Sequence, residues 1–230
     1  RFGFGISLLN LYENDFYIVR DKNGVPLTDV LSALELENGS YFIGTRLFND
    51  GLKYYSADGQ LIRTFGSPVA EAPQGKSISQ NLSHPFVWDM ASTSDGTVWA
   101  GTGWPTKGDG GLNKIVPGEN EIIRYKQDSS NNQSLAGDWI ANIFIDGSNR
   151  LWISSRNEGW SRIEPGRETI IRGFGDQDKE LPEPDSWSGG FIDQSGNLIF
   201  EYDYNYFKVD HQTLEISPFY KYENREDYRY

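Results

Sequence analysis

Five aromatic residues stand beside short apolar runs of this 230-residue sequence, where loops lead into or out of expected strands. They are Phe86, Trp88, Trp104, Trp139 and Trp187. An aromatic ring stacks on the flat C–H face of a sugar, while nearby carboxylates and amides bind its hydroxyls. The polar partners close in sequence are Asp89, Asp138, Asn142 and Asp185. These nine residues are our candidate ligand-binding residues, and the alternative is that the rings cap sheet edges while Asp138 shapes a turn.

Other kinds of site find little support in the sequence. There is no cysteine, and neither His84 nor His211 has a partner at the spacing of a metal site or a catalytic triad. The segment 176–180 alternates acidic residues, but it lacks the glycine and the distal glutamate of a calcium loop. No glycine-rich phosphate loop is present. We therefore expect no metal and no cofactor, and we assign no catalytic residue.

One short sequence pattern occurs four times, and the strands and turns that it predicts must position these residues. The copies are "LENGSYFIGT", "TSDGTVWAGT", "DGSNRLWISS" and "DQSGNLIFEY". Their turn residues are Gly39, Gly96, Asn149 and Gly196, which recur every 47 to 57 residues. A period in this range is typical of propeller blades, each of which holds four strands.

Each copy predicts four antiparallel strands. A strand precedes the turn, a second follows it, and two more come after a variable loop. The turn residues Asp58, Asp95, Asp146 and Asp193 are expected to form Asx-type hydrogen bonds. The bulky residues Phe42, Trp99, Trp152 and Ile199 share one position in the second strand, and stacking of neighbouring blades would bury them. Small residues follow them, Gly44 and Gly101, and allow close approach between blades.

The predicted fold is an all-β propeller of about four and a half blades within one segment, 1–230. The blades are expected at 27–66, 82–126, 135–175 and 185–219, with a half blade at 1–20 and a tail at 220–230. We expect an open section of a larger propeller. The alternative is a small closed ring in which strands near the end complete the half blade.

Charge and hydropathy limit the partners. The chain has 33 acidic and 21 basic residues and a net charge of −12, which repels nucleic acid and anionic membranes. No apolar run is long enough to span a bilayer, so we expect no membrane contact by this segment.

The motifs resemble the repeat of the two-component regulator propeller family. The most similar copies are "LSHPFVWDMASTSDGTVWAGT" with "GGLNKIVPGEN", and "LAGDWIANIFIDGSNRLWISS" with "GWSRIEPGRE". "LTDVLSALELENGSYFIGT" follows the pattern, whereas in "SWSGGFIDQSGNLIFEY" Glu201 and Tyr202 replace the usual Gly-Thr. The resemblance covers roughly residues 5–219. It implies a periplasmic sensor region that binds carbohydrates or related nutrients and signals to a kinase, which this chain does not contain.

The resulting expectation is a non-catalytic sensing propeller with a small-molecule or oligosaccharide ligand, and a homodimer formed through the full-length protein. Two alternatives stay open. One is a propeller enzyme acting on glycans, either a lyase or a glycoside hydrolase. The other is a protein-interaction platform with no small ligand.

Overall fold

The computed structural model describes residues 7–10, 15–20, 23–46, 51–66, 73–104, 109–156, 158–173, 189–202 and 205–220. These residues form strands and turns, and none of them lies in a helix, so no helix of the described part could cross a membrane. The all-β prediction is confirmed. A two-stranded hairpin comes first, and four antiparallel sheets of four or five strands follow it along the chain.

The strands follow sequence order. The hairpin pairs β1 (Ser7–Asn10) with β2 (Asp15–Ile18). The first sheet contains β3 (Val30–Glu35), β4 (Tyr41–Thr45), β5 (Leu52–Tyr55) and β6 (Leu61–Phe65). The second contains β7 (Lys76–Ser79), β8 (Val87–Ser92), β9 (Val98–Gly103), β10 (Gly110–Ile115) and β11 (Ile122–Tyr125). The third contains β12 (Ile140–Ile145), β13 (Leu151–Ser155), β14 (Gly159–Ile163) and β15 (Ile170–Arg172). The fourth contains β16 (Gly190–Ile192), β17 (Leu198–Tyr202), β18 (Asn205–Val209) and β19 (Ile216–Tyr220).

Acidic side chains hold the turns between the first two strands of a sheet. In the second sheet Asp95 Oδ1 accepts from the Thr97 N–H at 3.0 Å, and in the fourth Asp193 Oδ1 accepts from the Asn197 N–H at 2.9 Å. Asp146 Oδ1 accepts from the Arg150 N–H at 2.9 Å in the third. The Asx-type prediction is therefore confirmed for these three residues. Asp58 instead accepts a hydrogen bond from the Ser56 hydroxyl.

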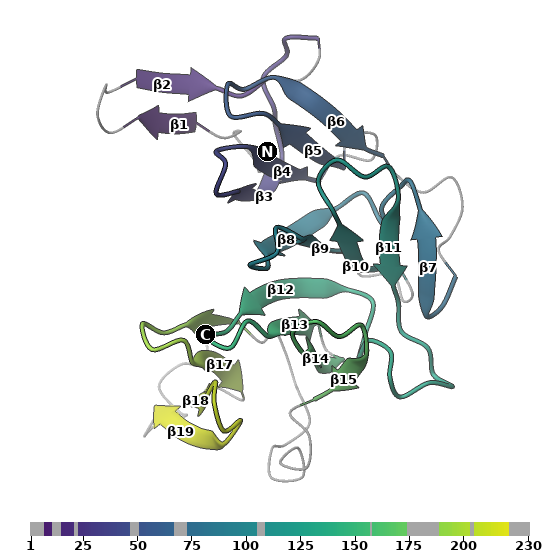
Figure 1. Ribbon diagram of the computed structural model, residues 1–230, viewed down its shortest axis with the longest axis vertical. Coiled ribbons are helices and arrows are strands. Elements are labelled where there is room, and N and C mark those ends of the chain that lie inside the picture. The colour runs from purple at the N-terminus through teal and green to yellow at the C-terminus, as the bar shows by residue number, and fades with distance from the viewer. Residues whose placement is uncertain are drawn as a thin grey trace, which may run out of the picture.

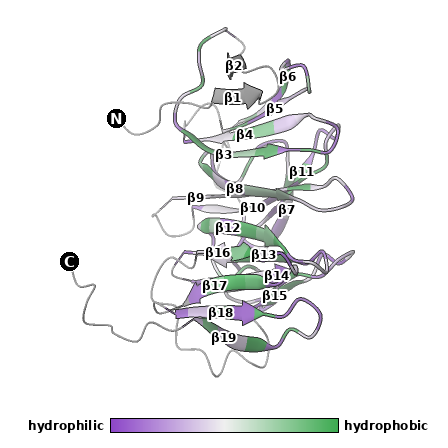
Figure 2. Cartoon of the chain, turned by 90° about the vertical axis from the view of Figure 1, so that its left-hand side faces the viewer, coloured by the Kyte–Doolittle hydropathy of each residue, from purple (hydrophilic) through white to green (hydrophobic). Residues whose placement is uncertain are grey.

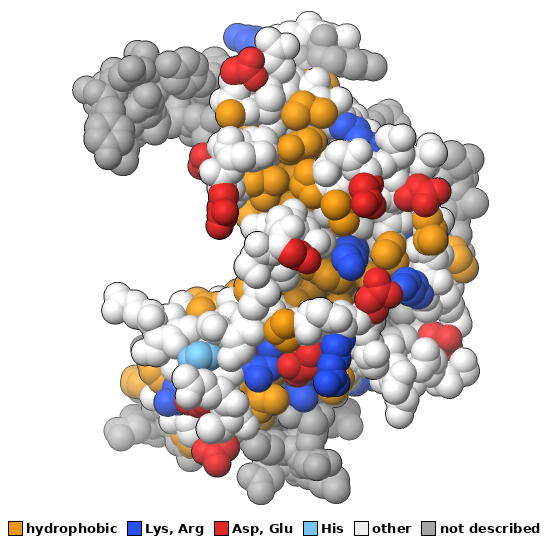
Figure 3. Space-filling view, viewed as in Figure 1, with side chains coloured by type: hydrophobic (Ala, Val, Ile, Leu, Met, Phe, Trp, Pro, Cys, Tyr) orange, Lys and Arg blue, Asp and Glu red, His pale blue; other side chains and the backbone are white. Residues whose placement is uncertain are grey.

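The four sheets follow one another around an arc (Figure 1). The innermost strand β8 contacts β3 of the sheet before it and β12 of the sheet after it. Figure 2 shows these strands and β16 stacked one above another on the side that faces the viewer. The described sheets border a notch on the left of Figure 3, so they form an arc and not a closed ring.

The core lies between consecutive sheets. Phe42, Trp99 and Trp152 are 0%, 5% and 0% exposed, and each packs in a cluster with residues of the following sheet. In the first two sheets, close approach depends on the glycine two residues further on, whereas the third sheet has Ser154 there. A Cβ at Gly44 would lie 2.8 Å from Val87 Cβ, and one at Gly101 would lie 2.5 Å from Ile140 Cγ2. The expectation that stacked blades bury these aromatic residues is confirmed.

The second sheet has one strand more than its pattern predicts. β7 pairs antiparallel with β11, from Lys76 opposite Tyr125 to Ser79 opposite Ile122. It precedes the range 82–126 that the repeat indicates for this blade. Its sequence, Lys-Ser-Ile-Ser, has one apolar residue, Ile78, which is exposed. A strand so short and polar carries little hydrophobic signal of its own.

Candidate functional site

The aromatic cluster of Phe86, Trp88, Trp104 and Trp139 spans the second and third sheets. Trp88 is the extra residue of a bulge in β8, where the register shifts between Val87 and Asp89. Trp104 follows β9, and Trp139 precedes β12. The ring centroids of Trp88 and Trp104 are 6.4 Å apart, and those of Trp88 and Trp139 are 6.0 Å apart. Four of the five predicted aromatic residues are thus brought together, because the Phe86 ring lies 5.1 Å from that of Trp104.

Backbone and cationic contacts hold the cluster in place. Trp88 Nε1 donates to the Gly103 carbonyl at 2.6 Å, and the Gly103 N–H donates to the Phe86 carbonyl at 3.2 Å. The Arg156 guanidinium lies 4.1 Å from the centroid of the Trp139 ring. Trp104 is 38% exposed, whereas Phe86 is buried beneath it. The cluster therefore offers an accessible aromatic surface on a fixed support, which suits stacking on an apolar ligand face.

The predicted polar partners are used within the protein. Asp89 Oδ1 accepts from the Met90 N–H at 2.9 Å, and Asp89 Oδ2 accepts from the Ile143 N–H of the next sheet at 2.7 Å. Asp138 Oδ1 accepts from the Gln127 N–H at 2.6 Å. Asn142 Nδ2 donates to Ser154 Oγ at 3.1 Å. These three side chains lie near the cluster but connect strands and sheets. The remaining two candidates, Asp185 and Trp187, lie outside the described residues.

Burial raises the pKa of Asp89, although the hydrogen bonds from Ile143 and Met90 oppose this shift. Both carboxylate oxygens accept from a backbone N–H, so Asp89→Asn would place an amide N–H₂ against one of those donors. We expect this variant to lower the free energy of unfolding by about 1–3 kcal/mol, the cost of an unsatisfied buried group. Urea unfolding monitored by tryptophan fluorescence measures the change. The control is Asp58→Asn at an exposed turn, and equal effects in the two variants would contradict the proposed role of Asp89.

His84 is also part of this region. Its Nδ1 accepts from the Phe86 N–H at 3.1 Å, which places the proton of the neutral ring on Nε2. Burial lowers its pKa, while the charge of Asp109 acts in the opposite direction. A histidine in this tautomer donates from Nε2. His211 instead joins the third and fourth sheets, since its carbonyl accepts from Ser148 Oγ at 2.7 Å.

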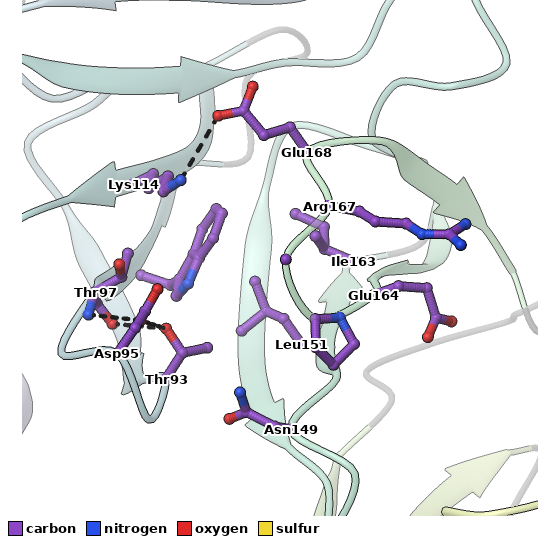
Figure 4. A pocket seen from close by; sticks show the side chains of 13 residues that line it. Thr93, Asp95, Thr97, Lys114, Asn149, Leu151, Ile163, Glu164, Arg167 and Glu168 are labelled. Atoms are coloured by element: carbon purple, nitrogen blue, oxygen red, sulfur yellow. Dashed lines mark hydrogen bonds and ion pairs between the residues drawn. The ribbon is translucent and has the colours of Figure 1, made fainter.

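A separate cleft opens at the other end of β8 and β9, between the second and third sheets (Figure 4). Its volume is about 210 Å³. Thr93, Asp95 and Asn149 come from turns, Lys114 from β10, and Glu168 from the segment before β15. Among the described residues, no group of three or more His, Asp or Glu side chains could hold a metal ion there or elsewhere. Sequence reasoning missed this cleft, because its residues come from two repeats and Trp99 was assigned to the core.

A β-propeller consists of four-stranded sheets arranged around a common axis, with one edge strand of each sheet nearest to that axis. This chain forms a section of that fold. No protein-family model matches the sequence, and no curated protein matches it. Solved structures of several proteins share the fold, and three of them are compared with this chain. An extracellular domain assigned to the hybrid two component system BT3049 of B. thetaiotaomicron matches with a TM-score of 0.65 at 17% identity, over 93% of this chain and 26% of that one.

The second structure is a catalytically inactive virginiamycin B lyase from Staphylococcus aureus. It matches with a TM-score of 0.60 at 16% identity, over 94% of this chain and 62% of that one. The third is an auxiliary nutrient binding protein from Bacteroides ovatus, with a TM-score of 0.52, 11% identity and coverage of 92% and 47%. The chain thus spans less than two thirds of each structure. At these identities the likeness establishes the fold.

Proposed function

We propose that this chain is the ligand-sensing β-propeller section of a bacterial two-component sensor, lies in the periplasm, and binds a carbohydrate or related nutrient without cleaving it. The observation that carries the proposal is the aromatic cluster, whose exposed Trp104 lies over a fixed support of Trp88 and Phe86. Fold likeness to an extracellular domain of a hybrid two component system and to a nutrient binding protein agrees with this reading.

The position of the cluster suggests how binding would become a signal. Trp88 belongs to β8 of the second sheet, and Trp139 leads into β12 of the third. A ligand that contacts both rings would favour one relative placement of the two sheets over others. Such a difference in affinity between two arrangements is what shifts a conformational equilibrium. In the full-length protein the shift would pass to a kinase, with a homodimer as the signalling unit.

An enzyme acting on glycans receives less support from the same region. A glycosidase needs one carboxyl group that protonates the leaving oxygen and a second that attacks the sugar or activates a water. Asp89 and Asp138 both lie near the cluster, but each accepts hydrogen bonds from backbone N–H groups. A protein-interaction platform needs no small ligand, and the experiment below distinguishes it.

The test is calorimetric titration of the chain with a panel of neutral oligosaccharides. We expect at least one to bind, and we expect Trp104→Ala to weaken that binding about tenfold or more, because one stacked ring contributes roughly 1–2 kcal/mol. Phe191→Ala is the matched control, since Phe191 is an aromatic residue 48% exposed on the fourth sheet.

Three results would oppose the proposal. Failure of every sugar to bind folded protein would favour a partner protein. Release of shortened sugars would favour the enzyme. Equal weakening by both variants would remove the aromatic cluster as the site.

A further inference from the structure

Two tryptophans at equivalent positions differ in one hydrogen bond. Trp152 Nε1 in the third sheet donates to Asp146 Oδ2 at 3.0 Å. Trp99 is its counterpart in the second sheet, and its Nε1 is buried with no hydrogen-bond partner. The cause is the residue that opens the turn: Thr93 replaces the aspartate. The turns are otherwise alike, because the Thr93 N–H donates to the Thr97 carbonyl just as the Asp146 N–H donates to that of Arg150.

A second polar group beside Trp99 is unsatisfied as well. The hydroxyl of Tyr125 is buried and has no hydrogen-bond partner, and its ring centroid lies 6.0 Å from that of Trp99. Both side chains are more than nine-tenths buried. An unpaired buried donor costs about 1–3 kcal/mol, so native proteins rarely keep one without a use.

Trp99 lines the cleft between the second and third sheets that Figure 4 shows. Leu151 and Ile163 add apolar surface, and Asn149 and Lys114 add polar groups. The volume of the cleft is about 210 Å³. This space suits a molecule of about the size of a monosaccharide.

One cation in the cleft has capacity for a ligand. The Lys114 ammonium lies 5.7 Å from the Trp99 ring centroid and 3.7 Å from Glu168 Oε1, which is longer than a hydrogen bond. Glu168 also pairs with Lys76. Asp95 already accepts from the Thr93 hydroxyl at 2.7 Å. Figure 4 shows the Arg167 guanidinium directed away from the cleft. Glu164 also lines the cleft and pairs with Arg150 and Arg162, so Lys114 is the cation that a ligand carboxylate would meet there.

We infer that this cleft is a second ligand site, and that it takes a small carboxylate-bearing molecule up to the size of a monosaccharide acid. The carboxylate pairs with Lys114, and another oxygen of the ligand accepts from Trp99 Nε1–H. That nitrogen is buried in the structure, so binding requires a side-chain adjustment of the kind common on complex formation. The site is distinct from the aromatic cluster, which lies at the opposite end of β8.

The experiment uses D-glucuronate, with D-glucose as a matched control that lacks the carboxylate. Indole N–H resonances of ¹⁵N-labelled protein are recorded during titration, and Trp99→Phe identifies the signal of Trp99. We expect glucuronate, and not glucose, to shift that signal. Lys114→Gln should weaken binding about tenfold or more, since a charged hydrogen bond contributes about 1.5–3 kcal/mol.

Thr93→Asp is the decisive variant, because it supplies the internal acceptor that Asp146 provides in the third sheet. We expect it to abolish the glucuronate response of Trp99. Trp104→Ala should leave that response intact, which separates this site from the proposed oligosaccharide site. The inference is overturned if glucose acts like glucuronate, if Thr93→Asp still responds, or if Trp104→Ala removes the response.

Discussion

Gly110→Ala is expected to cost at least about 3 kcal/mol of unfolding free energy. Gly110 has a φ of +127°, a conformation that side chains rarely adopt. An added Cβ would lie 2.3 Å from the Asp138 carbonyl oxygen and 2.5 Å from that of Thr102. Both contacts are with backbone, so relief requires the chain between the second and third sheets to move. Urea unfolding at equilibrium measures the loss.

Gly118→Ala separates backbone strain from the clash. Gly118 has a φ of +93°, but an added Cβ there meets no atom within 4 Å. This control variant should lose only the unfolding free energy that comes from backbone strain, about 1–2 kcal/mol. Similar losses in the two variants would show that the close approach at Gly110 is unimportant. Because Asp138 precedes Trp139, Gly110→Ala should also disturb the aromatic cluster and weaken sugar binding.

Trp152→Ala is the second substitution with a large expected effect, about 3–5 kcal/mol, which is typical of deleting a buried aromatic side chain. Trp152 is fully buried between the third and fourth sheets, in a cluster with Trp160, Leu198 and Phe200. The substitution leaves a cavity and removes one of the donors to the carboxylate of Asp146, which keeps Arg150 as a partner. Since whole domains are stable by about 5–15 kcal/mol, this variant should be close to unfolding at 37 °C. Calorimetry and urea titration give the value.

Trp152→Phe is the matched control, because it keeps an aromatic ring while it removes the indole N–H and part of the indole ring. It should lose about 1–3 kcal/mol, mainly through the charged hydrogen bond. A loss below 1 kcal/mol in Trp152→Ala would mean that the fourth sheet does not depend on this contact.

The elements of the fold that depend on residues close together in the sequence were predictable. Turn residues such as Asp95 and Gly96 act within a few positions of themselves, so four copies of one pattern predicted sheets of antiparallel strands. The position of Trp152 was predictable for the same reason, because every copy places a bulky residue there. β7 was not, since four mostly polar residues form a strand only where the edge of β11 is available to them.

The candidate site was predictable in its aromatic part and not in its polar part. Trp88, Trp104 and Trp139 are large residues beside strand ends, which the sequence displays directly. The partner of Asp89 is the N–H of Ile143, more than fifty positions away and in another sheet. Such a pair cannot be recognised from the sequence because its members are far apart along the chain. The sequence therefore predicted that Asp89 binds a ligand, whereas its carboxylate connects two sheets. The cleft beside Trp99 was hidden for the same reason.

The arc described above has a consequence for how the chain loses its structure. The second and third sheets each pack between two neighbours, and the apolar clusters lie almost wholly between adjacent sheets. Each sheet is therefore stabilised by its contacts with its direct neighbours. A sheet with one neighbour separates at a lower free-energy cost than a sheet with two. Both inferred ligands would bind at the interface between the second and third sheets, so ligand binding would strengthen the contact between these two sheets.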